Sequence, residues 1–426
     1  MEKGQEPERQ EGKKESEEQY SFLQEKIKDK PVNWKKIRYT ALFTAGAGLI
    51  FGFCVCLGFY GLQPWAREHF TEDTKKVTIS KETEEETEDN AVQEEEEKQP
   101  EPATLTIDNY RELNRALYDV AREASKSIVK ISVKDAGEAW LENEKSSESA
   151  GLLMADNGRA VLILTKGSVL QGDQPTIRVT FPDDSVCEAK MVARDRNLDL
   201  AVVAVEKSAL SDTVWTYAKY AELGNSNVVG RGDAVIALGS PFGSYGGIGY
   251  GILSTLKEQI TLTDGSFKLL TSDICGTENS TGILVDLKGK VIGILRSTGD
   301  TDSSILLTAY PISEIREQME LLLNQTAVPY LGIIGTDIPD AVKEEKKIEK
   351  GIYVREVEPD SPAMQAGIQS GDVVIEIDGT EINTMTAYKN KLLSYKAGDR
   401  LRVKGKREGA DGYVAVNYEA VIGSKE

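Results

Sequence analysis

Histidine is almost absent from this chain: there is one in 426 residues, His69, just past a hydrophobic segment. Cysteine is nearly as rare, with four residues and no C-x-x-C pair. A structural zinc site takes four Cys or His ligands, so this set argues against one. A P-loop and a dinucleotide-binding G-x-G-x-x-G sequence are also absent. We therefore expect neither a metal nor an organic cofactor.

The cysteines fall into two pairs. Cys54 and Cys56 lie inside the hydrophobic segment, and Cys187 and Cys275 lie in the globular part. We expect the second pair to be buried free thiols. A Cys187–Cys275 disulfide is the alternative if this part of the chain is outside the cytoplasm.

The net charge of −19 is unevenly distributed. Residues 82–101 hold 11 acidic residues and one base, Lys98, a net charge of −10 for that stretch. Such a segment is too polar and self-repelling to fold, so residues 63–103 are expected to be an acidic, disordered linker. No basic stripe accompanies the rest of the chain, which argues against a nucleic-acid partner.

Residues 41–62 carry no charged side chain over 22 positions. At about 1.5 Å per residue, a helix of this length spans the hydrocarbon layer of a bilayer. The preceding flank contains Lys35, Lys36 and Arg38, so the positive-inside rule places residues 1–40 in the cytoplasm and the remainder outside. The pattern predicts a single-pass plasma-membrane protein; a buried core helix is the alternative.

Folded sequence is expected from about Thr104. Leu113, Leu117, Val120 and Ala121 recur at helical spacing and predict a helix. Short β-branched runs separated by turn residues then predict an antiparallel barrel or sandwich. The expected strands are 127–133, 161–165, 176–181, 201–205, 234–238 and 291–295. A helix over residues 312–324 closes this unit, giving domains at 104–326 and 327–426.

Three stretches of the first domain, residues 120–131, 230–243 and 310–333, resemble the trypsin-like domain of the HtrA/DegP family. The most distinctive, GRGDAVIALGSPFG, is similar to the family's G-D-x-V-x-A-x-G-x-P-F-G sequence. The resemblance implies two β-barrels with an active site between them. The expected fold class is therefore mainly β: an N-terminal transmembrane helix, a trypsin-like double β-barrel and a C-terminal α+β domain.

The positions that match the family's catalytic triad are incomplete. Ser280 in ENSTGILV matches the nucleophile of G-N-S-G-G-P-L-V, and Asp199 in DRNLDLAV matches the orienting aspartate. Ser168 in LTKGSVL stands where L-T-N-x-H-V-V has the histidine. A serine hydroxyl is no base near neutral pH, and loss of the base lowers triad catalysis by roughly 10⁴–10⁶-fold. Glu278 replaces a glycine beside the developing oxyanion, where a carboxylate is unfavourable.

An active enzyme is the alternative. Lys166 lies two residues before Ser168, and Ser-Lys dyads are a known variant of the triad. In that case Ser280 is a nucleophile with an unusual base, and the chain is a divergent serine endopeptidase. Otherwise Ser280 is an inert turn residue.

The second domain resembles a PDZ domain of the circularly permuted bacterial type. The matching stretches are GIYVREV (351–357), SPAMQAGI (361–368) and GDVVIEIDG (371–379). Ser361 is expected to cap a short helix that Gly367 ends, and Asp378-Gly379 to form a hairpin turn. In the strand before that turn, alternation predicts inward-facing side chains at Val373, Ile375 and Ile377.

A PDZ domain binds an extended C-terminal peptide as an added strand, with the peptide carboxylate in a nest of backbone N–H groups. The resemblance places that nest at one loop and the opposite groove wall on a helix over 384–394. The candidate binding residues are Tyr330, Leu331, Gly332, Ile333, Tyr388 and Leu392. Packing against the protease-like domain is the alternative role.

Together these expectations describe a membrane-tethered, extracytoplasmic pseudoprotease that binds exposed peptide or unfolded-protein C-termini. The resemblance implies a role in protein quality control or envelope signalling. It also implies an oligomer, either a homotrimer or a mixed assembly with an active homologue.

Overall fold

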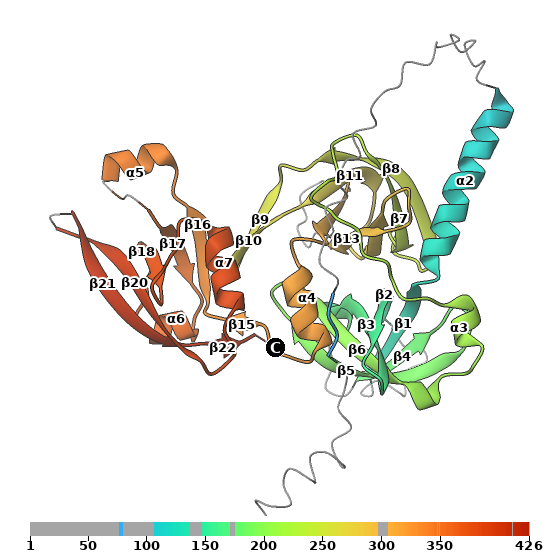
Figure 1. Ribbon diagram of the computed structural model, residues 1–426, viewed down its shortest axis with the longest axis horizontal. Helices are drawn as coiled ribbons and strands as arrows, with labels where there is room; N and C mark the ends of the chain where they lie inside the picture. Colours follow the sequence, from blue (N-terminus) through green and yellow to red (C-terminus); the bar gives the residue numbers. More distant parts are fainter. Residues whose placement is uncertain are drawn as a thin grey trace, which may run out of the picture. The chain divides into compact units, whose positions relative to one another are not determined.

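The computed structural model describes residues 76–79, 106–135, 147–170, 175–296, 306–346, 348, 350–410 and 412–425. All of these residues belong to one compact unit, Thr74–Glu426, shown in Figure 1. None of the helices within these ranges combines the length and apolarity needed to cross a bilayer. The expected span at 41–62 and His69 lie outside the described residues, so the membrane anchor stays a prediction.

The first barrel closes six antiparallel strands in the order β1-β2-β3-β6-β5-β4. Its strands are β1 (Ile128–Asp135), β2 (Ser147–Asp156), β3 (Ala160–Lys166), β4 (Pro175–Thr180), β5 (Val186–Asp195) and β6 (Leu200–Glu206). Short helical turns follow at η2 (Gly167–Leu170), η3 (Lys207–Ala209) and α3 (Val214–Tyr217). The β-branched side chains of Val129, Ile131, Ile163 and Val203 fill its interior.

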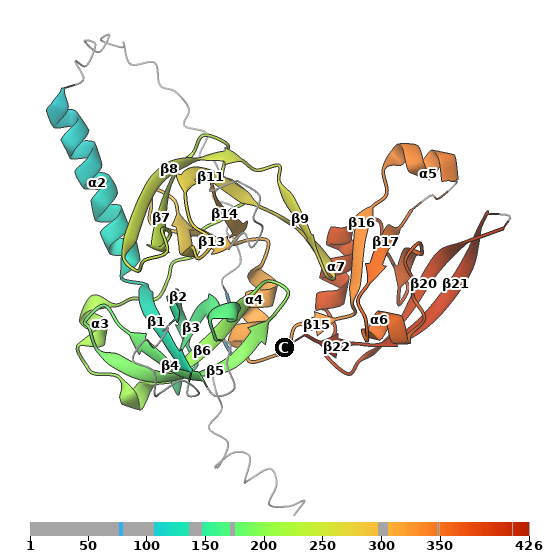
Figure 2. The same ribbon diagram turned by 180° about the vertical axis from the view of Figure 1, so that it is seen from behind.

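The second barrel closes in the order β11-β14-β13-β12-β7-β8. Its strands are β7 (Ala234–Ser240), β8 (Gly247–Thr255), β11 (Leu270–Cys275), β12 (Thr281–Val285), β13 (Val291–Arg296) and β14 (Leu306–Pro311). A separate two-stranded hairpin, β9 (Gln259–Leu262) and β10 (Gly265–Lys268), projects from it towards the second domain (Figure 2). The expected double β-barrel is confirmed, with each predicted strand within two residues of an observed one.

The helices agree with expectation in part. Helix α2 (Ile107–Ser125) forms as expected, with Thr106 as its N-cap, and of the four apolar residues at helical spacing only Ala121 is buried. Leu113 is 57% exposed, because most of the helix extends beyond the barrel and only its last turns pack on the core. The closing helix α4 (Arg316–Leu323) begins later than residue 312, since Ile312 and Ile315 instead fill the barrel core.

Part of the expected linker is folded. The Val77 N–H donates to Asn324 Oδ1 at 2.9 Å, and Asn324 Nδ2 donates to the Val77 carbonyl at 2.8 Å. Ile79 is buried in the core cluster. These residues precede the acidic run, so an apolar, β-branched segment was wrongly included in the spacer.

The second domain is a sheet in the order β16-β17-β18-β20-β21, with β19 paired to β18. Its strands are β15 (Pro329–Tyr330), β16 (Ile333–Asp337), β17 (Ile352–Val357), β18 (Val373–Ile377), β19 (Thr380–Glu381), β20 (Arg400–Gly409), β21 (Gly412–Val421) and β22 (Gly423–Ser424). Its helices are α5 (Asp340–Lys346), α6 (Pro362–Gln365) and α7 (Met385–Leu393). β16 is an edge strand of this sheet, and β15 pairs with β22.

The turn and cap predictions in this domain are confirmed. Ser361 accepts a hydrogen bond from the Met364 N–H at the start of α6. Asp378 and Gly379 both have positive φ, as a two-residue hairpin turn requires. The inward alternation is confirmed at Val373 and Ile377, which are fully buried, but not at Ile375. Val374 is buried and Ile375 is only half-buried, because a β-bulge between Val374 and Glu376 shifts the register.

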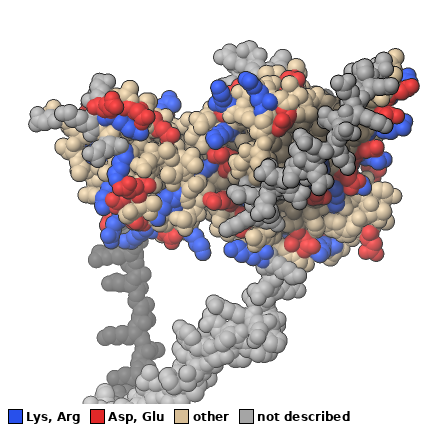
Figure 3. All heavy atoms as spheres, turned by 45° about the horizontal axis from the view of Figure 1, so that its top comes forward, with Lys and Arg blue, Asp and Glu red and all other residues tan. Residues whose placement is uncertain are grey.

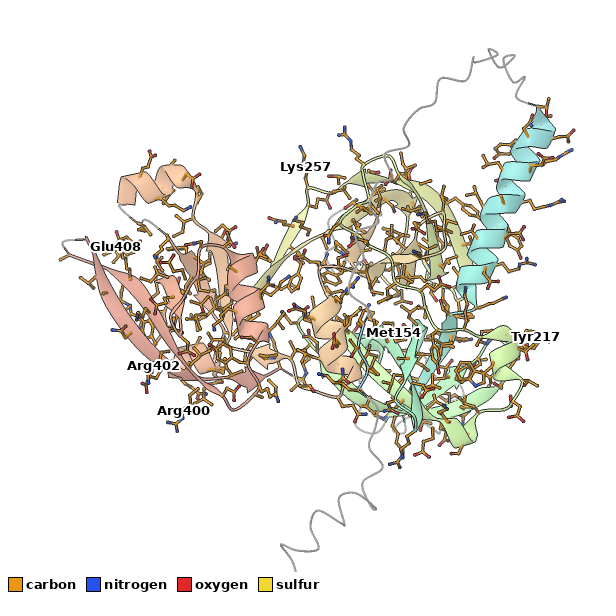
Figure 4. All side chains as sticks on the ribbon, viewed as in Figure 1. Met154, Tyr217, Lys257, Arg400, Arg402 and Glu408 are labelled. Carbon is orange, nitrogen blue, oxygen red and sulfur yellow. The ribbon has the colours of Figure 1, made fainter. Side chains whose placement is uncertain are left out.

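The surface carries charges of both signs. On the face in Figure 3, Lys and Arg are interspersed with Asp and Glu over the described residues, without a basic stripe. Arg400 and Arg402 on β20 extend into solvent (Figure 4). Cys187 and Cys275 are both free thiols, but Cys275 is exposed, contrary to expectation.

Candidate functional site

Ser168 and Asp199 bond to each other. Ser168 lies in the turn after β3, and its Oγ donates to Asp199 Oδ2 at 2.7 Å, while its N–H donates to Asp199 Oδ1 at 2.5 Å. The Gly167 N–H donates to the Asp199 carbonyl at 2.8 Å. Where a triad aspartate would orient an imidazole, this carboxylate fixes a turn of 3-10 helix.

Ser280 is turned into the protein. Its side chain closes the turn between β11 and β12 and is 1% exposed. Its Oγ lies 2.6 Å from the carbonyl oxygen of Pro241 and 2.8 Å from that of Thr277, and accepts from the Thr277 N–H at 2.8 Å. Within the described part of the chain, no hydrogen bond joins it to Ser168, Asp199 or Lys166. A serine nucleophile needs both access and a base within hydrogen-bond reach.

The main-chain N–H of Ser280 also has a partner within the turn. The Ser280 N–H, which a serine protease directs at the oxyanion, donates to the Thr277 carbonyl at 3.0 Å. Glu278 is exposed and keeps a negative φ, so the loop does not use a glycine-only conformation there. Gly282 is the one retained glycine, and a Cβ on it would lie 2.0 Å from the Leu238 carbonyl oxygen.

Thr281, which also replaces a glycine, has a structural partner. Its Oγ1 accepts a hydrogen bond from the Ala150 N–H at 3.0 Å, and this buried contact joins β12 of the second barrel to β2 of the first. The Thr281 side chain, which a glycine would lack, therefore adds a hydrogen bond between the two barrels.

A cavity of about 170 Å³ lies between the barrels. Lys166 and Asp199 line it from the first barrel, Arg296 and Tyr310 from the second, and Leu262 from the β9–β10 hairpin. Ser280 is not among its lining residues. The cavity therefore brings together a carboxylate and two cations, but not the nucleophile. In the described residues no cluster of three His, Cys, Asp or Glu side chains has the geometry of a metal site.

Asp195, four residues before Asp199, is a buried carboxylate. Its Oδ1 accepts from the Asn197 N–H at 2.8 Å, while Oδ2 has no hydrogen-bond partner. Burial raises the pKa of the Asp195 carboxyl to about 6, against the opposing effect of the Asn197 and Leu198 N–H groups. The hydrogen bonds to Asp195 hold the loop before β6 in place, whereas burial of the carboxylate lowers stability.

The expected carboxylate nest exists, and it holds a carboxylate from the same chain. The N–H groups of Leu331, Gly332 and Ile333 donate to the side chain of Asp264 at 2.7, 2.8 and 3.0 Å. Tyr388 Oη donates to Asp264 Oδ1 at 2.7 Å. Gly332 has φ +97°, and a Cβ there would lie 2.2 Å from the Cβ of Ser361, so the nest requires glycine.

The remaining predicted groove residues surround this contact. Tyr388 is fully buried, Leu392 is buried beside it in the domain core, and Tyr330 donates from Oη to Glu358 Oε2 at 2.5 Å. Their role in peptide binding stays a prediction. Nothing in the sequence singles out Asp264; Asp264-Gly265 indicates only a hairpin turn.

Burial raises the pKa of the Asp264 carboxyl, and its hydrogen bonds with the nest and Tyr388 oppose that effect. Part of the stabilisation from these four donors therefore offsets desolvation. The contact is weaker than the number of its hydrogen bonds suggests.

Comparison with known proteins agrees with the fold. Residues 149–294 match the trypsin-like peptidase domain family, and residues 329–417 match the PDZ domain family. The chain is 30% identical over 295 residues to "Serine protease Do-like HtrA" of Lactobacillus helveticus, covering 65% of this chain and 69% of that protein. Its namesake in Bacillus subtilis (strain 168) is 27% identical over 331 residues, covering 73% and 72%.

Solved structures show the same fold. "HtrA-type protease AlgW with tripeptide" has a TM-score of 0.54 at 24% identity, covering 72% of this chain and 97% of that one. "HtrA-type protease AlgW with decapeptide" has a TM-score of 0.53 at 23% identity, covering 73% and 99%.

Ser280→Ala should lower the free energy of unfolding by about 1–3 kcal/mol, because it leaves the Thr277 N–H without its acceptor in a buried turn. Urea unfolding followed by circular dichroism measures this. Ser208→Ala, at an exposed serine in η3, is the matched control and should change stability by less than about 0.5 kcal/mol. Equal stability of the two variants would contradict a structural role for the Ser280 hydroxyl.

Asp195→Asn should remove a pH dependence. The folded-state pKa of Asp195 is raised above the unfolded value of about 4, so the native state binds more protons between pH 4 and 6 and loses stability as pH rises through that window. The wild type should lose up to about 3 kcal/mol relative to the variant from pH 4 to pH 7. Thermal unfolding at each pH tests this, and parallel curves for the two proteins would contradict it.

Proposed function

The chain belongs to the HtrA family of trypsin-like serine proteases with a PDZ domain, and we propose that it is a non-catalytic member that binds exposed peptide C-termini. The observation that carries this proposal is the hydrogen bond between Ser168 Oγ and Asp199 Oδ2. A serine occupies the position of the general base, and the aspartate that would orient a histidine is committed to it.

The other parts of the machinery support the same conclusion. Ser280 is buried with its hydroxyl engaged by main-chain atoms, and its N–H is used within the turn. Removing the base alone costs roughly 10⁴–10⁶-fold in triad catalysis. Loss of an oxyanion donor adds about 10²–10³-fold. The two losses fall on the proton transfer and on the charge stabilisation, the two contributions on which triad catalysis depends.

The PDZ domain supplies the proposed binding activity. The converging N–H groups of Leu331, Gly332 and Ile333 hold a carboxylate, and β16 beside them is an edge strand. These are the two elements that an added peptide strand needs. The AlgW structures, which share this fold, contain a tripeptide and a decapeptide, and this favours peptide binding by the present chain as well.

We further propose that residues 41–62 tether the protein to the plasma membrane with the folded domains outside, where exposed C-termini report on protein quality. Assembly is part of the proposal. Helix α2 exposes a series of large apolar side chains that a homotrimer, or a mixed trimer with an active homologue, would cover: Ile107, Tyr110, Leu113 and Tyr118.

An active endopeptidase is the second candidate. The relatives are named serine proteases, and Lys166 lines the same cavity as Asp199. This candidate requires Ser280 to leave its buried turn and approach Lys166.

Hydrolysis of fluorescein-labelled β-casein by the full chain, purified in mild detergent, separates the two candidates. We expect the wild type, Ser280→Ala and the Ser208→Ala control to release fluorescence at the same background rate. A fluorophosphonate probe, which labels activated serines without needing a variant, should not label the wild type. A rate lost only in Ser280→Ala, or labelling of the wild type, would overturn the proposal and make Ser280 a nucleophile.

A further inference from the structure

The tip of the β9–β10 hairpin lies in the PDZ nest. Asp264 has φ +57° between the two strands, and its side chain accepts three main-chain N–H groups and the Tyr388 hydroxyl. Its own N–H donates to the Ile333 carbonyl at 2.7 Å. These contacts bury the residue to 8% exposure.

This is the bonding pattern of a ligand's last residue. A C-terminal residue added as a strand beside β16 would present its carboxylate to the nest and its N–H to a β16 carbonyl. Asp264 supplies both groups to the same places, with its side-chain carboxylate standing in for a main-chain one. A peptide carboxylate and Asp264 therefore compete for the same donors.

The rest of the hairpin lies over the groove. Phe267 on β10 is buried against α7, with Lys389 Nζ 4.6 Å from its ring centre. Lys389 in turn pairs with Glu314 at 2.8 Å. Figures 1 and 2, which view the protein from opposite sides, both show the hairpin reaching α7. An entering peptide would meet the hairpin along the groove as well as at the nest.

The hairpin is held at its tip and along β10, where Phe267 is buried in the barrel core cluster. Thr263 Oγ1 donates to Glu358 Oε1 at 2.5 Å, and Asn197 Nδ2 donates to the Thr263 carbonyl at 2.7 Å. At the base of the hairpin, Lys257 points into solvent (Figure 4). A peptide therefore need not lift the whole hairpin, because the turn that carries Asp264 can move out of the nest while Phe267 stays packed on Tyr310 of β14.

We propose that the β9–β10 hairpin is an internal ligand of the PDZ domain, with Asp264 occupying the carboxylate nest until an external C-terminus displaces it. The inference rests on the proposed peptide-binding function and states how that site is regulated. The apparent affinity for a peptide is then the intrinsic affinity multiplied by the fraction of molecules whose nest is open.

The first measurement is fluorescence anisotropy with the full chain. The probe is an equimolar pool of fluorescein-labelled decapeptides, random at nine positions and ending in Val, Leu, Ile or Phe with a free carboxylate, because the nest lies on an apolar core containing Leu331 and Ile333. Asp264→Asn, which keeps the turn but removes the charge, should bind the pool about tenfold or more tightly than the wild type. Neither the wild type nor the variant should bind the same pool with amidated C-termini.

The second measurement needs no peptide. Hydrogen exchange of a fragment containing Tyr330–Ile334 should be about tenfold or more faster in Asp264→Asn than in the wild type, because the nest N–H groups lose their acceptor. Asp184→Asn, the same change at a positive-φ turn that is exposed, is the control and should match the wild type. Asp264→Gly also suits this φ and repeats the test if the first variant is unstable by circular dichroism.

The outcomes separate the two proposals. Unchanged exchange in Asp264→Asn overturns the internal ligand, and so does equal binding of the free-carboxylate pool by wild type and variant, which leaves the peptide-binding function standing. If hydrogen exchange is faster in Asp264→Asn but neither the wild type nor the variant binds the peptide pool, the peptide-binding function is overturned. The ligand role of the hairpin is then overturned with it.

Discussion

Three backbone N–H groups that point at one spot must be given an acceptor, and this constraint organises the second domain. The loop at Leu331–Ile333 can form only because Gly332 takes a positive φ against Ser361. Once formed, it cannot satisfy its own donors, and burying them unpaired would cost about 1–3 kcal/mol each. Asp264 meets that demand from 67 residues away in sequence. The hairpin, the Tyr388 hydroxyl and the edge strand β16 are all arranged around this one carboxylate.

In the barrels, the residues at the positions that match the triad make structural hydrogen bonds. Asp199 fixes a turn through Ser168, Ser280 closes the turn before β12, and Thr281 joins the barrels through Ala150. Each polar group there has found a main-chain or neighbouring partner. A poised active site would instead hold such groups incompletely satisfied until substrate arrived. Restoring a histidine alone would therefore leave the nucleophile and the oxyanion donor engaged elsewhere.

Local patterns predicted the local structure well. Strand positions, the Ser361 cap and the Asp378-Gly379 turn depend on a few neighbouring residues, so the sequence carries them directly. Local patterns did not predict features that depend on tertiary contacts. Leu113 lies at helical spacing but is exposed, and the bulge in β18 changes which side chains face inward. The triad positions were found by motif, yet the orientation of Ser280 was not. Asp264 was missed because its partners are distant in sequence and its own surroundings indicate only a turn.

Because the nest and Asp264 belong to one polypeptide, the encounter between them cannot be diluted. A separate inhibitor would dissociate as the protein became scarce, whereas a tethered one competes at a fixed effective concentration. The threshold for opening the groove is then set by the concentration of free C-termini and not by the concentration of the protein itself. The concentration of free C-termini that opens the groove is therefore the same in a cell with few copies of the protein as in one with many.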